Sequence, residues 1–275
     1  MGEGLPSSRG LSPRTVLDEI VEETSVEVAE RKARTPQATV ERQARAAPAP
    51  RDFAAALSTP VLSVIAELKA KSPSGGRLIQ GAYRPSDLAE AYAAAGAAAL
   101  SVLTQGSRFG GAPEHLALAR REVRIPILRK DFVTDEYQVF EARAYGADAV
   151  LLIVAALQEG QLRELLALTR RLGMEALVEA HTTRELDIAV TLDAKVIGIN
   201  HRNLKTLTVD TGLTARLRPR VPGGRLLVAE SGIRDAADAR RQRAVGADAV
   251  LVGEALLRAD DPKTLIREMT RVERE

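Results

Sequence analysis

The stretch that decides the fold is residues 146–180, which read GADAVLLIVAALQEGQLRELLALTRRLGMEALVEA. Residues 149–154 and 175–180 are short, mainly apolar runs of the kind that form buried strands. Between them, 159–172 places leucines along one broad helical stripe, and Gly173 follows where a helix would end. A strand, a helix and a second strand in this order form one βαβ unit, in which the two strands run parallel.

The same alternation continues through most of the chain after Val61. Strands are predicted at 61–68, 98–104, 126–132, 149–154, 175–180, 196–200, 225–230 and 249–252. Helices are predicted near 85–95, 113–122, 135–145, 159–172, 182–192, 210–219, 234–245 and 261–273. Eight consecutive units favour a parallel sheet buried on both faces, closed into a (βα)8 TIM barrel of the α/β class. The hexapeptide GADAVL recurs at 146–151 and 246–251, which supports repeated units whether shared packing or ancestral duplication produced it.

The region before the barrel is predicted to be a helical extension. Residues 1–14 are rich in Gly, Ser and Pro, so we expect them to be disordered. We predict a helix over 15–34, a connector rich in Ala, Pro and Arg over 35–50, and a short helix over 51–57. The extension 15–57 and the barrel 58–275 are then expected to form one domain.

The composition excludes several kinds of site. The chain has 275 residues, 45% of them hydrophobic, which suits one large domain. Cysteine is absent, so disulfides and thiolate metal sites are excluded. The three histidines show no ligand spacing, and we expect His181 and His201 to be pocket-edge or solvent residues. No metal and no cofactor is predicted.

Charge and hydropathy argue against nucleic acids and membranes as partners. The formal charge is +2 with a pI of about 9.0, the charges are dispersed, and aromatics make up 3%, so no nucleic-acid surface is predicted. The strongest apolar run, 149–157, is far shorter than the roughly 20 residues of a membrane span. No signal peptide is evident, so a cytoplasmic protein without membrane contact is expected. No feature of the sequence identifies a protein partner.

Polar residues follow the predicted strands at the end where barrel active sites lie. These residues are Glu67, Lys69, Lys130, Glu179, Asn200, Arg202 and Glu230. Side chains alternate along a strand, so Glu67 and Lys69 should share a face. Only seven of the 39 basic residues are lysines, which favours a functional role for Lys69 and Lys130 over an incidental surface charge. Charges at the rim of an apolar core are costly unless they are paired or functional, so the sequence predicts an active site here.

A phosphate site is predicted beside these residues. Ser231-Gly232 and Gly253-Glu254 follow the last two strands, where such barrels commonly bind phosphate. Their backbone N–H groups would approach the anion, and 254–258 is expected to form a short extra helix. Lys71 and Ser72, from the loop after the first strand, are expected to close the same pocket.

Seven segments together resemble the indole-3-glycerol-phosphate synthase family. They are VIAELKAKSPSGG at 64–76, SVLT at 101–104, PILRKDF at 126–132, LVE at 177–179, GINHRNL at 198–204, AESGI at 229–233 and LVGE at 251–254. The resemblance covers nearly the whole chain after about residue 15. Gln105 and Ala70 depart from it, where the family commonly has an acidic and a basic residue.

The resemblance implies a metal-free reaction in tryptophan biosynthesis. The family converts 1-(2-carboxyphenylamino)-1-deoxyribulose 5-phosphate to indole-3-glycerol phosphate with loss of carbon dioxide and water. By resemblance, Lys130 is the general acid at the ketone oxygen, and Glu179 and Lys69 serve the later proton transfers. Glu67 would tune Lys69, and Asn200 would hold the substrate hydroxyl groups.

The resemblance also implies how the substrate is held. Phe109, Phe132 and Leu151 would line the slot for the anthranilate ring. Arg202 and Glu230 would shape the pocket. The phosphate would rest on the backbone of Ser231, Gly232, Gly253 and Glu254, with Lys71 and Ser72 nearby.

Two alternatives to ring closure stay open at this point. One is another phosphoribosyl-handling barrel, such as an enzyme like phosphoribosylanthranilate isomerase. The other is a barrel that binds a phosphorylated metabolite without turning it over. The pair of lysines, Lys69 and Lys130, fits ring closure better than an aminoaldose-to-ketose shift.

Overall fold

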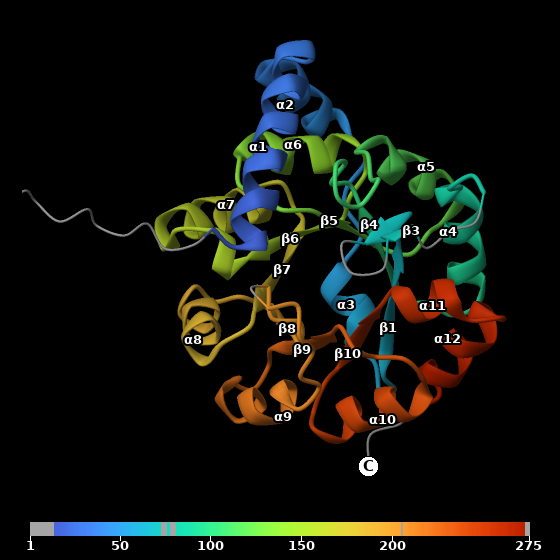
Figure 1. Ribbon diagram of the computed structural model, residues 1–275. Helices are drawn as coiled ribbons and strands as arrows, with labels where there is room; N and C mark the ends of the chain where they lie inside the picture. The colour runs from blue at the N-terminus through green and yellow to red at the C-terminus, as the bar shows by residue number, and fades with distance from the viewer. Residues whose placement is uncertain (1–13, 73–75, 78–80, 205, 273–275) are drawn as a thin grey trace, which may run out of the picture.

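The fold is a closed barrel of parallel strands (Figure 1). The computed structural model describes residues 14–72, 76–77, 81–204 and 206–272. Within them the barrel strands are β1 (Ser63–Leu68), β4 (Ala99–Leu103), β5 (Ile127–Lys130), β6 (Ala149–Ile153), β7 (Glu175–Ala180), β8 (Val196–Asn200), β9 (Leu226–Glu230) and β10 (Ala249–Val252). β1 pairs with both β10 and β4, so the sheet closes on itself without an edge. The predicted fold class is confirmed.

Helices surround the barrel at the predicted intervals. They are α4 (Pro85–Ala94), α5 (Glu114–Glu122), α6 (Glu136–Ala144), α7 (Glu159–Arg171), α8 (Thr183–Thr191), α9 (Leu213–Leu217), α10 (Ala236–Ala244), α11 (Glu254–Arg258) and α12 (Pro262–Thr270). Two 3-10 turns, η1 (Val154–Ala156) and η2 (Arg218–Arg220), and a small hairpin of β2 (Lys71–Ser72) and β3 (Gly76–Arg77) were not predicted. Side chains of Asp135, Thr182, Asp235 and Asp261 cap α6, α8, α10 and α12, which explains where these helices begin.

Strand alternation places apolar and charged side chains at different heights inside the barrel. On β1, Ile65 is fully buried in the barrel interior and Glu67 lies two residues closer to the carboxyl end. On β7, Leu177 and Glu179 repeat this order. Because alternate residues face the same side, the next inward position after the apolar layer lies at the mouth. The charged residues therefore meet at one end of the barrel.

The N-terminal extension consists of three helices, α1 (Val16–Arg34), α2 (Gln37–Ala46) and α3 (Phe53–Leu57). The predicted connector over 35–50 is wrong, because most of it is α2. Val40 and Ala44, four residues apart, are buried on one face of α2, which packs against α6. Tertiary packing thus stabilises a helix whose short sequence carries little periodic signal. The predicted disorder of 1–14 falls almost wholly outside the described residues.

A buried ion-pair network ties the extension to the barrel. Arg129 on β5 is fully buried, and its guanidinium lies 2.8 Å from Asp131 and 2.9 Å from Glu141 of α6. Arg31 of α1 donates to the same Glu141 at 2.9 Å. Asp131 also accepts a hydrogen bond from Thr104. Asp131 therefore lies between the barrel and its helices, not in the mouth.

Among the described helices, none combines the length and the apolar character that crossing a membrane requires.

Candidate active site

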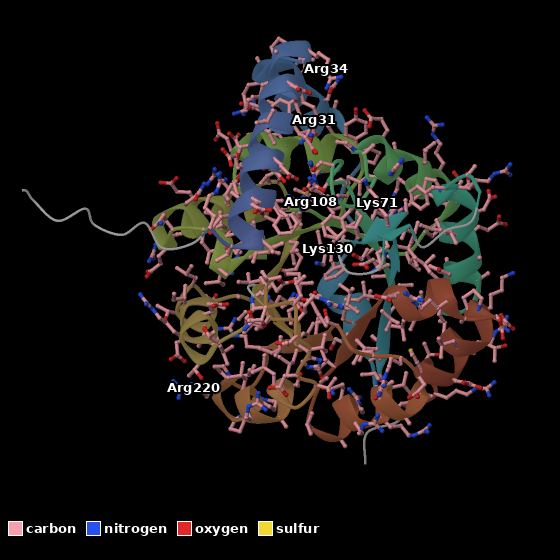
Figure 2. All side chains as sticks on the ribbon, viewed as in Figure 1. Arg31, Arg34, Lys71, Arg108, Lys130 and Arg220 are labelled. Carbon is pink, nitrogen blue, oxygen red and sulfur yellow. The ribbon has the colours of Figure 1, made fainter. Side chains whose placement is uncertain are left out.

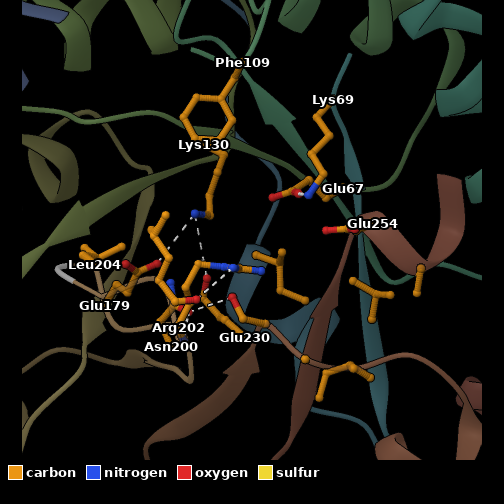
Figure 3. A pocket seen from close by; sticks show the side chains of 18 of the residues that line it. Glu67, Lys69, Phe109, Lys130, Glu179, Asn200, Arg202, Leu204, Glu230 and Glu254 are labelled. Carbon is orange, nitrogen blue, oxygen red and sulfur yellow. Dashed lines mark hydrogen bonds and ion pairs between the residues drawn. The ribbon is translucent and has the colours of Figure 1, made fainter. Parts of the chain in front are cut away.

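A cavity of about 640 Å³ opens at the carboxyl ends of the strands (Figure 3). Its lining includes thirteen of the sixteen residues predicted for the site, namely Glu67, Lys69, Phe109, Lys130, Phe132, Glu179, Asn200, Arg202, Glu230, Ser231, Gly232, Gly253 and Glu254. Figure 2 shows Lys130 near the centre of the view, inside the ring of strands, whereas Arg220 lies at the outer rim. The structure thus brings together residues that are up to 187 positions apart, from Glu67 to Glu254.

Lys69 and Glu67 form the first charged pair of the cavity. The ammonium of Lys69 lies 2.7 Å from a carboxylate oxygen of Glu67, and both side chains are mostly buried. Gly253 makes room for this pair, since a Cβ there would lie 2.2 Å from Glu67 Oε1 and 3.0 Å from Lys69 Nζ. The glycine that follows β10 is therefore needed for the packing of two site residues as well as for a loop.

Lys130 lies between two buried carboxyl groups. Its Nζ is 3.6 Å from Glu179 and 4.0 Å from Glu230. Burial alone would lower the pKa of Lys130, but the charges of Glu179, Glu230 and Glu67 outweigh burial and raise it above its ordinary value. Lys130 is therefore an ammonium at neutral pH. Both distances exceed a normal hydrogen bond, so the ammonium keeps donors for another acceptor.

The two carboxyl groups beside Lys130 ionise differently. Burial would raise the pKa of Glu179, but Lys130 and His181 outweigh burial and hold that pKa below its ordinary value. Burial and the neighbouring charge of Glu179 raise the pKa of Glu230 well above its ordinary value. The two pKa values are thus shifted in opposite directions, as expected where two buried carboxyl groups share one ammonium and the charge of one disfavours the charge of the other. Such a divergence is typical of acid–base sites.

Asn200 and Ser231 shape the rim between β8 and β9. Asn200 Oδ1 accepts hydrogen bonds from the Arg202 N–H at 3.0 Å and from the Ser231 hydroxyl at 2.8 Å. Ser231 and Gly232 both adopt left-handed backbone, with φ of 66° and 76°. His201 holds this turn, because its Nδ1 lies 2.8 Å from the Ser231 carbonyl and its Nε2 lies 2.7 Å from the Thr214 hydroxyl. The expectation that His201 is a pocket-edge or solvent residue is wrong, since it is 2% exposed and structural.

Apolar side chains form one wall of the cavity. The rings of Phe109 and Phe132 lie 6.2 Å apart at their centroids (Figure 3 shows Phe109 above Lys130). The prediction that Leu151 lines this wall is wrong. Leu151 is packed in the barrel interior, and Ile153, the next inward residue of β6, lines the cavity instead. β6 ends at Ile153, so Leu151 lies two residues before the end of the strand, deeper in the barrel than the cavity.

Comparison with known proteins gives the family. A family model described as "Indole-3-glycerol phosphate synthase" matches residues 17–269. The chain belongs to the indole-3-glycerol phosphate synthase family. Because the match begins within α1, the helical extension belongs to the region shared by indole-3-glycerol phosphate synthases.

Curated indole-3-glycerol phosphate synthases align along almost the whole chain. Indole-3-glycerol phosphate synthase 2 of Streptomyces coelicolor is 55% identical over 252 residues, which is 92% of this chain and 97% of that protein. The indole-3-glycerol phosphate synthase of Mycobacteroides abscessus is 48% identical over 259 residues, covering 94% and 95%. That of Saccharopolyspora erythraea is 48% identical over 255 residues, covering 93% and 94%.

Lys71 and Ser72 were predicted to bind phosphate, but neither is among the described residues that line the cavity. Lys71 donates from Nζ to the Ser107 carbonyl at 2.7 Å, which ties β2 to the loop after β4. The side chain of Ser72 lies outside the described part of the structure. Arg234 and Arg258, which were not predicted, also line the cavity, as do Ser231 and Gly253.

Other residues of the site escaped the sequence analysis. Val16, Leu17 and Ile20 of α1 line the cavity, so the extension covers part of the mouth. Gly198 on β8 faces Glu230, and a Cβ there would lie 2.2 Å from Glu230 Oε1. A glycine inside a strand was the available signal for such a close approach.

His181 contacts a residue of the site. Its Nε2 lies 3.3 Å from Glu179, and its Nδ1 lies 3.2 Å from Glu185, so the expectation of a pocket-edge or solvent histidine is wrong. Burial would lower the pKa of His181, but the two carboxylates raise it to about 10. Among the described residues, no group of three or more His, Asp or Glu side chains is arranged to hold a metal ion.

Proposed function

We propose that this chain closes the indole ring of 1-(2-carboxyphenylamino)-1-deoxyribulose 5-phosphate, releasing carbon dioxide and water to give indole-3-glycerol phosphate. The observation that carries the proposal is the position of Lys130, an ammonium 3.6 Å from Glu179 and 4.0 Å from Glu230, two buried carboxyl groups whose pKa values are shifted in opposite directions. Membership of the indole-3-glycerol phosphate synthase family supports the proposal. So do the relatives named indole-3-glycerol phosphate synthase, which align with this chain over almost their whole length. We expect the reaction in the cytoplasm and without a cofactor.

In the first step Lys130 acts as the general acid. The aryl carbon that bears the carboxylate attacks the ketone carbon, and Lys130 donates a proton to the ketone oxygen as that oxygen gains charge. The raised pKa of Lys130 means that it is protonated when the substrate binds. A fixed ammonium at the developing alkoxide supplies both the proton and electrostatic stabilisation.

The later steps remove carbon dioxide and then water. Loss of carbon dioxide returns an electron pair to the ring and restores its aromaticity. Dehydration then takes a proton from C1 of the former sugar and adds one to the departing hydroxyl. We assign the C1 proton to Glu179, the ionised carboxylate, and the hydroxyl proton to Lys69, whose ammonium is held by Glu67. No step in this sequence requires a metal ion.

Substrate binding divides the cavity into a ring end and a phosphate end. Phe109, Phe132 and Ile153 would hold the anthranilate ring, with Val16, Leu17 and Ile20 covering it from α1. Asn200 and Glu230 lie where the sugar hydroxyls would pass. The phosphate would accept hydrogen bonds from backbone N–H groups at Ser231, Gly232 and Gly253, beside Arg234 and Arg258. Clamping both ends presses the aryl carbon onto the ketone.

The direct test uses the purified chain and the carboxyphenylamino-deoxyribulose phosphate. We expect indole fluorescence to rise with time and carbon dioxide to be released in equal amount. No indole product at any enzyme concentration would overturn the proposal. Isomerisation of phosphoribosylanthranilate by the same preparation would favour the isomerase alternative, and substrate binding without turnover would favour a binding protein.

A further inference from the structure

The proposed reaction leaves one buried ionisable pair without a role. His181 follows β7 directly, and Glu185 lies in the first turn of α8. The side chain of His181 is 9% exposed and that of Glu185 is 19% exposed. Neither residue is among those that line the cavity, although His181 contacts Glu179, which does. A buried charged pair is costly to maintain, so its contact with Glu179 calls for an explanation.

The side chain of Glu185, in the first turn of α8, binds His181 instead of completing the cap of the helix. Thr182 caps α8, and its hydroxyl accepts from the Glu185 N–H, as in the capping-box sequence Thr-x-x-Glu. In a complete box, the glutamate side chain would accept from the Thr182 N–H. Here Glu185 Oε2 instead accepts from the His181 N–H at 2.8 Å and lies 3.2 Å from His181 Nδ1. Glu185 therefore fixes both the backbone and the ring of His181.

The ring in turn faces Glu179. His181 Nε2 lies 3.3 Å from Glu179 Oε1, whereas Lys130 lies 3.6 Å from the other oxygen, Oε2. Glu179 is thus held between two cations from different elements, one on β5 and one at the end of β7. Its side chain is 1% exposed, so water contributes little to solvating its charge.

The two cations differ in what the reaction does to them. Lys130 transfers its proton to the ketone oxygen in the first step: one N–H bond breaks, one O–H bond forms, and the amine is left neutral. From then until Lys130 is reprotonated, Glu179 has lost that countercharge. A buried carboxylate without a countercharge takes up a proton instead of remaining a base.

We propose that His181, held by Glu185, is the permanent countercharge of Glu179, a positioning residue that keeps this carboxylate ionised after Lys130 has given up its proton. The inference rests on the proposed function, because it presupposes that Lys130 discharges before Glu179 acts. The elevated pKa of His181, about 10, agrees with a ring that stays charged throughout the cycle. His181 touches no reacting atom and acts through Glu179 alone.

The charged neighbours of this group set the expected pH behaviour. His181 is faced by Glu179 from β7 and Glu185 from α8. Glu179 is faced by Lys130 from β5, by Glu230 from β9 and by His181. Removing His181 should raise the pKa of Glu179, and removing the charge of Glu185 should lower the pKa of His181.

Two variants test the proposal through opposite pH effects. His181→Gln should lower kcat at least about tenfold with KM changed less than about threefold, and kcat should fall further toward acid as Glu179 protonates. Glu185→Gln should keep most of the activity near pH 6 and lose it toward alkaline pH as His181 deprotonates. His115→Gln, a histidine on α5 that packs against Tyr83, is the matched control and should leave both profiles unchanged.

A measurement independent of turnover completes the test. In nitrogen–proton spectra of the wild-type protein, the ring signals that disappear in His181→Gln should show a doubly protonated imidazolium up to about pH 9. A neutral His181 ring at pH 8 would overturn the proposal. So would equal losses of kcat in His181→Gln and Glu185→Gln if the pH profile of kcat kept its wild-type shape in both. If the wild type itself forms no indole product, the proposed function fails; if the wild type is active and His181→Gln matches it, only the countercharge fails.

Discussion

At the scale of single residues, catalysis should depend on Lys130 more than stability does. Lys130→Met keeps the aliphatic stem and removes the ammonium, so turnover should fall by at least ~10². Glu179 retains His181 as a partner, and the raised pKa of Glu230 favours its neutral form, so the melting temperature should stay close to that of wild type. Steady-state fluorescence assays and thermal unfolding measure the two effects. Unfolding of the variant at assay temperature would instead make Lys130 a structural residue.

Gly198 gives a residue-scale prediction that concerns shape alone. Gly198→Ala would put a methyl group 2.2 Å from Glu230 Oε1 on the neighbouring strand, so the carboxyl group of Glu230 must leave its position beside Lys130. We expect kcat/KM to drop by about 10²-fold from such a displacement. Gly223→Ala is the control, because a Cβ there meets nothing within 4 Å and the residue lies in a turn before β9. Wild-type kcat/KM in Gly198→Ala would contradict this reading of the strand contact.

At the scale of elements, glutamates of α1 bind the loop after β4 through hydrogen bonds and an ion pair. Glu27 accepts from the N–H groups of Gly106 and Ser107 at 3.1 and 2.9 Å, and Glu23 binds Arg108 and Ser107 (Figure 2 shows Arg108 beside α1). Hydrogen bonds from Arg108 and then Ser107 lower the pKa of Glu23 to about 2. The loop carries Phe109, so α1 positions one wall of the cavity besides covering it.

These contacts between α1 and the loop predict that weakening them lowers substrate affinity. Glu27→Gln removes the charge and one of the two acceptor oxygens, so the loop should hold Phe109 less firmly and KM should rise several-fold. We expect kcat to change less than KM, because Lys130 and Glu179 are untouched. Glu30→Gln, an exposed glutamate on the same helix, is the control for loss of charge. An unchanged KM in Glu27→Gln would mean that the loop keeps its shape without α1.

At the scale of the whole molecule, the raised pKa of Glu230 makes the free energy of unfolding depend on pH. Its pKa is raised in the folded state, so between the unfolded value near 4.3 and the folded value the native protein holds one proton more than the unfolded chain. Folding stability should therefore fall as pH rises through this window, by about 1.4 kcal/mol per unit from this group. Glu230→Gln cannot ionise, so its free energy of unfolding should decline less than that of wild type between two pH values chosen just above the unfolded value, such as about pH 4.5 and 5.5. Denaturant unfolding at both pH values measures the difference, and parallel declines would contradict the assignment.

The sequence by itself determined the barrel, the order of its strands and most of the site. Periods of apolar residues predict strands and helices because burial of alternating or striped side chains is a local property. Polar residues after strands then point to the mouth, since parallel strands end at a common edge. Seven of the thirteen predicted residues that line the cavity, Lys130 and Glu179 among them, follow from this rule, whereas Phe109 and Phe132 were predicted from the family resemblance.

Tertiary structure decided what local periodicity cannot express. The height of a side chain within the barrel excluded Leu151 and admitted Ile153, and packing on α6 made a helix of residues 37–46. The contact of His181 with Glu179 and the space left by Gly198 depend on how neighbouring strands stagger. So do the opposite pKa shifts of Glu179 and Glu230, because a pKa is set by burial and by charges that the fold brings close from distant parts of the chain.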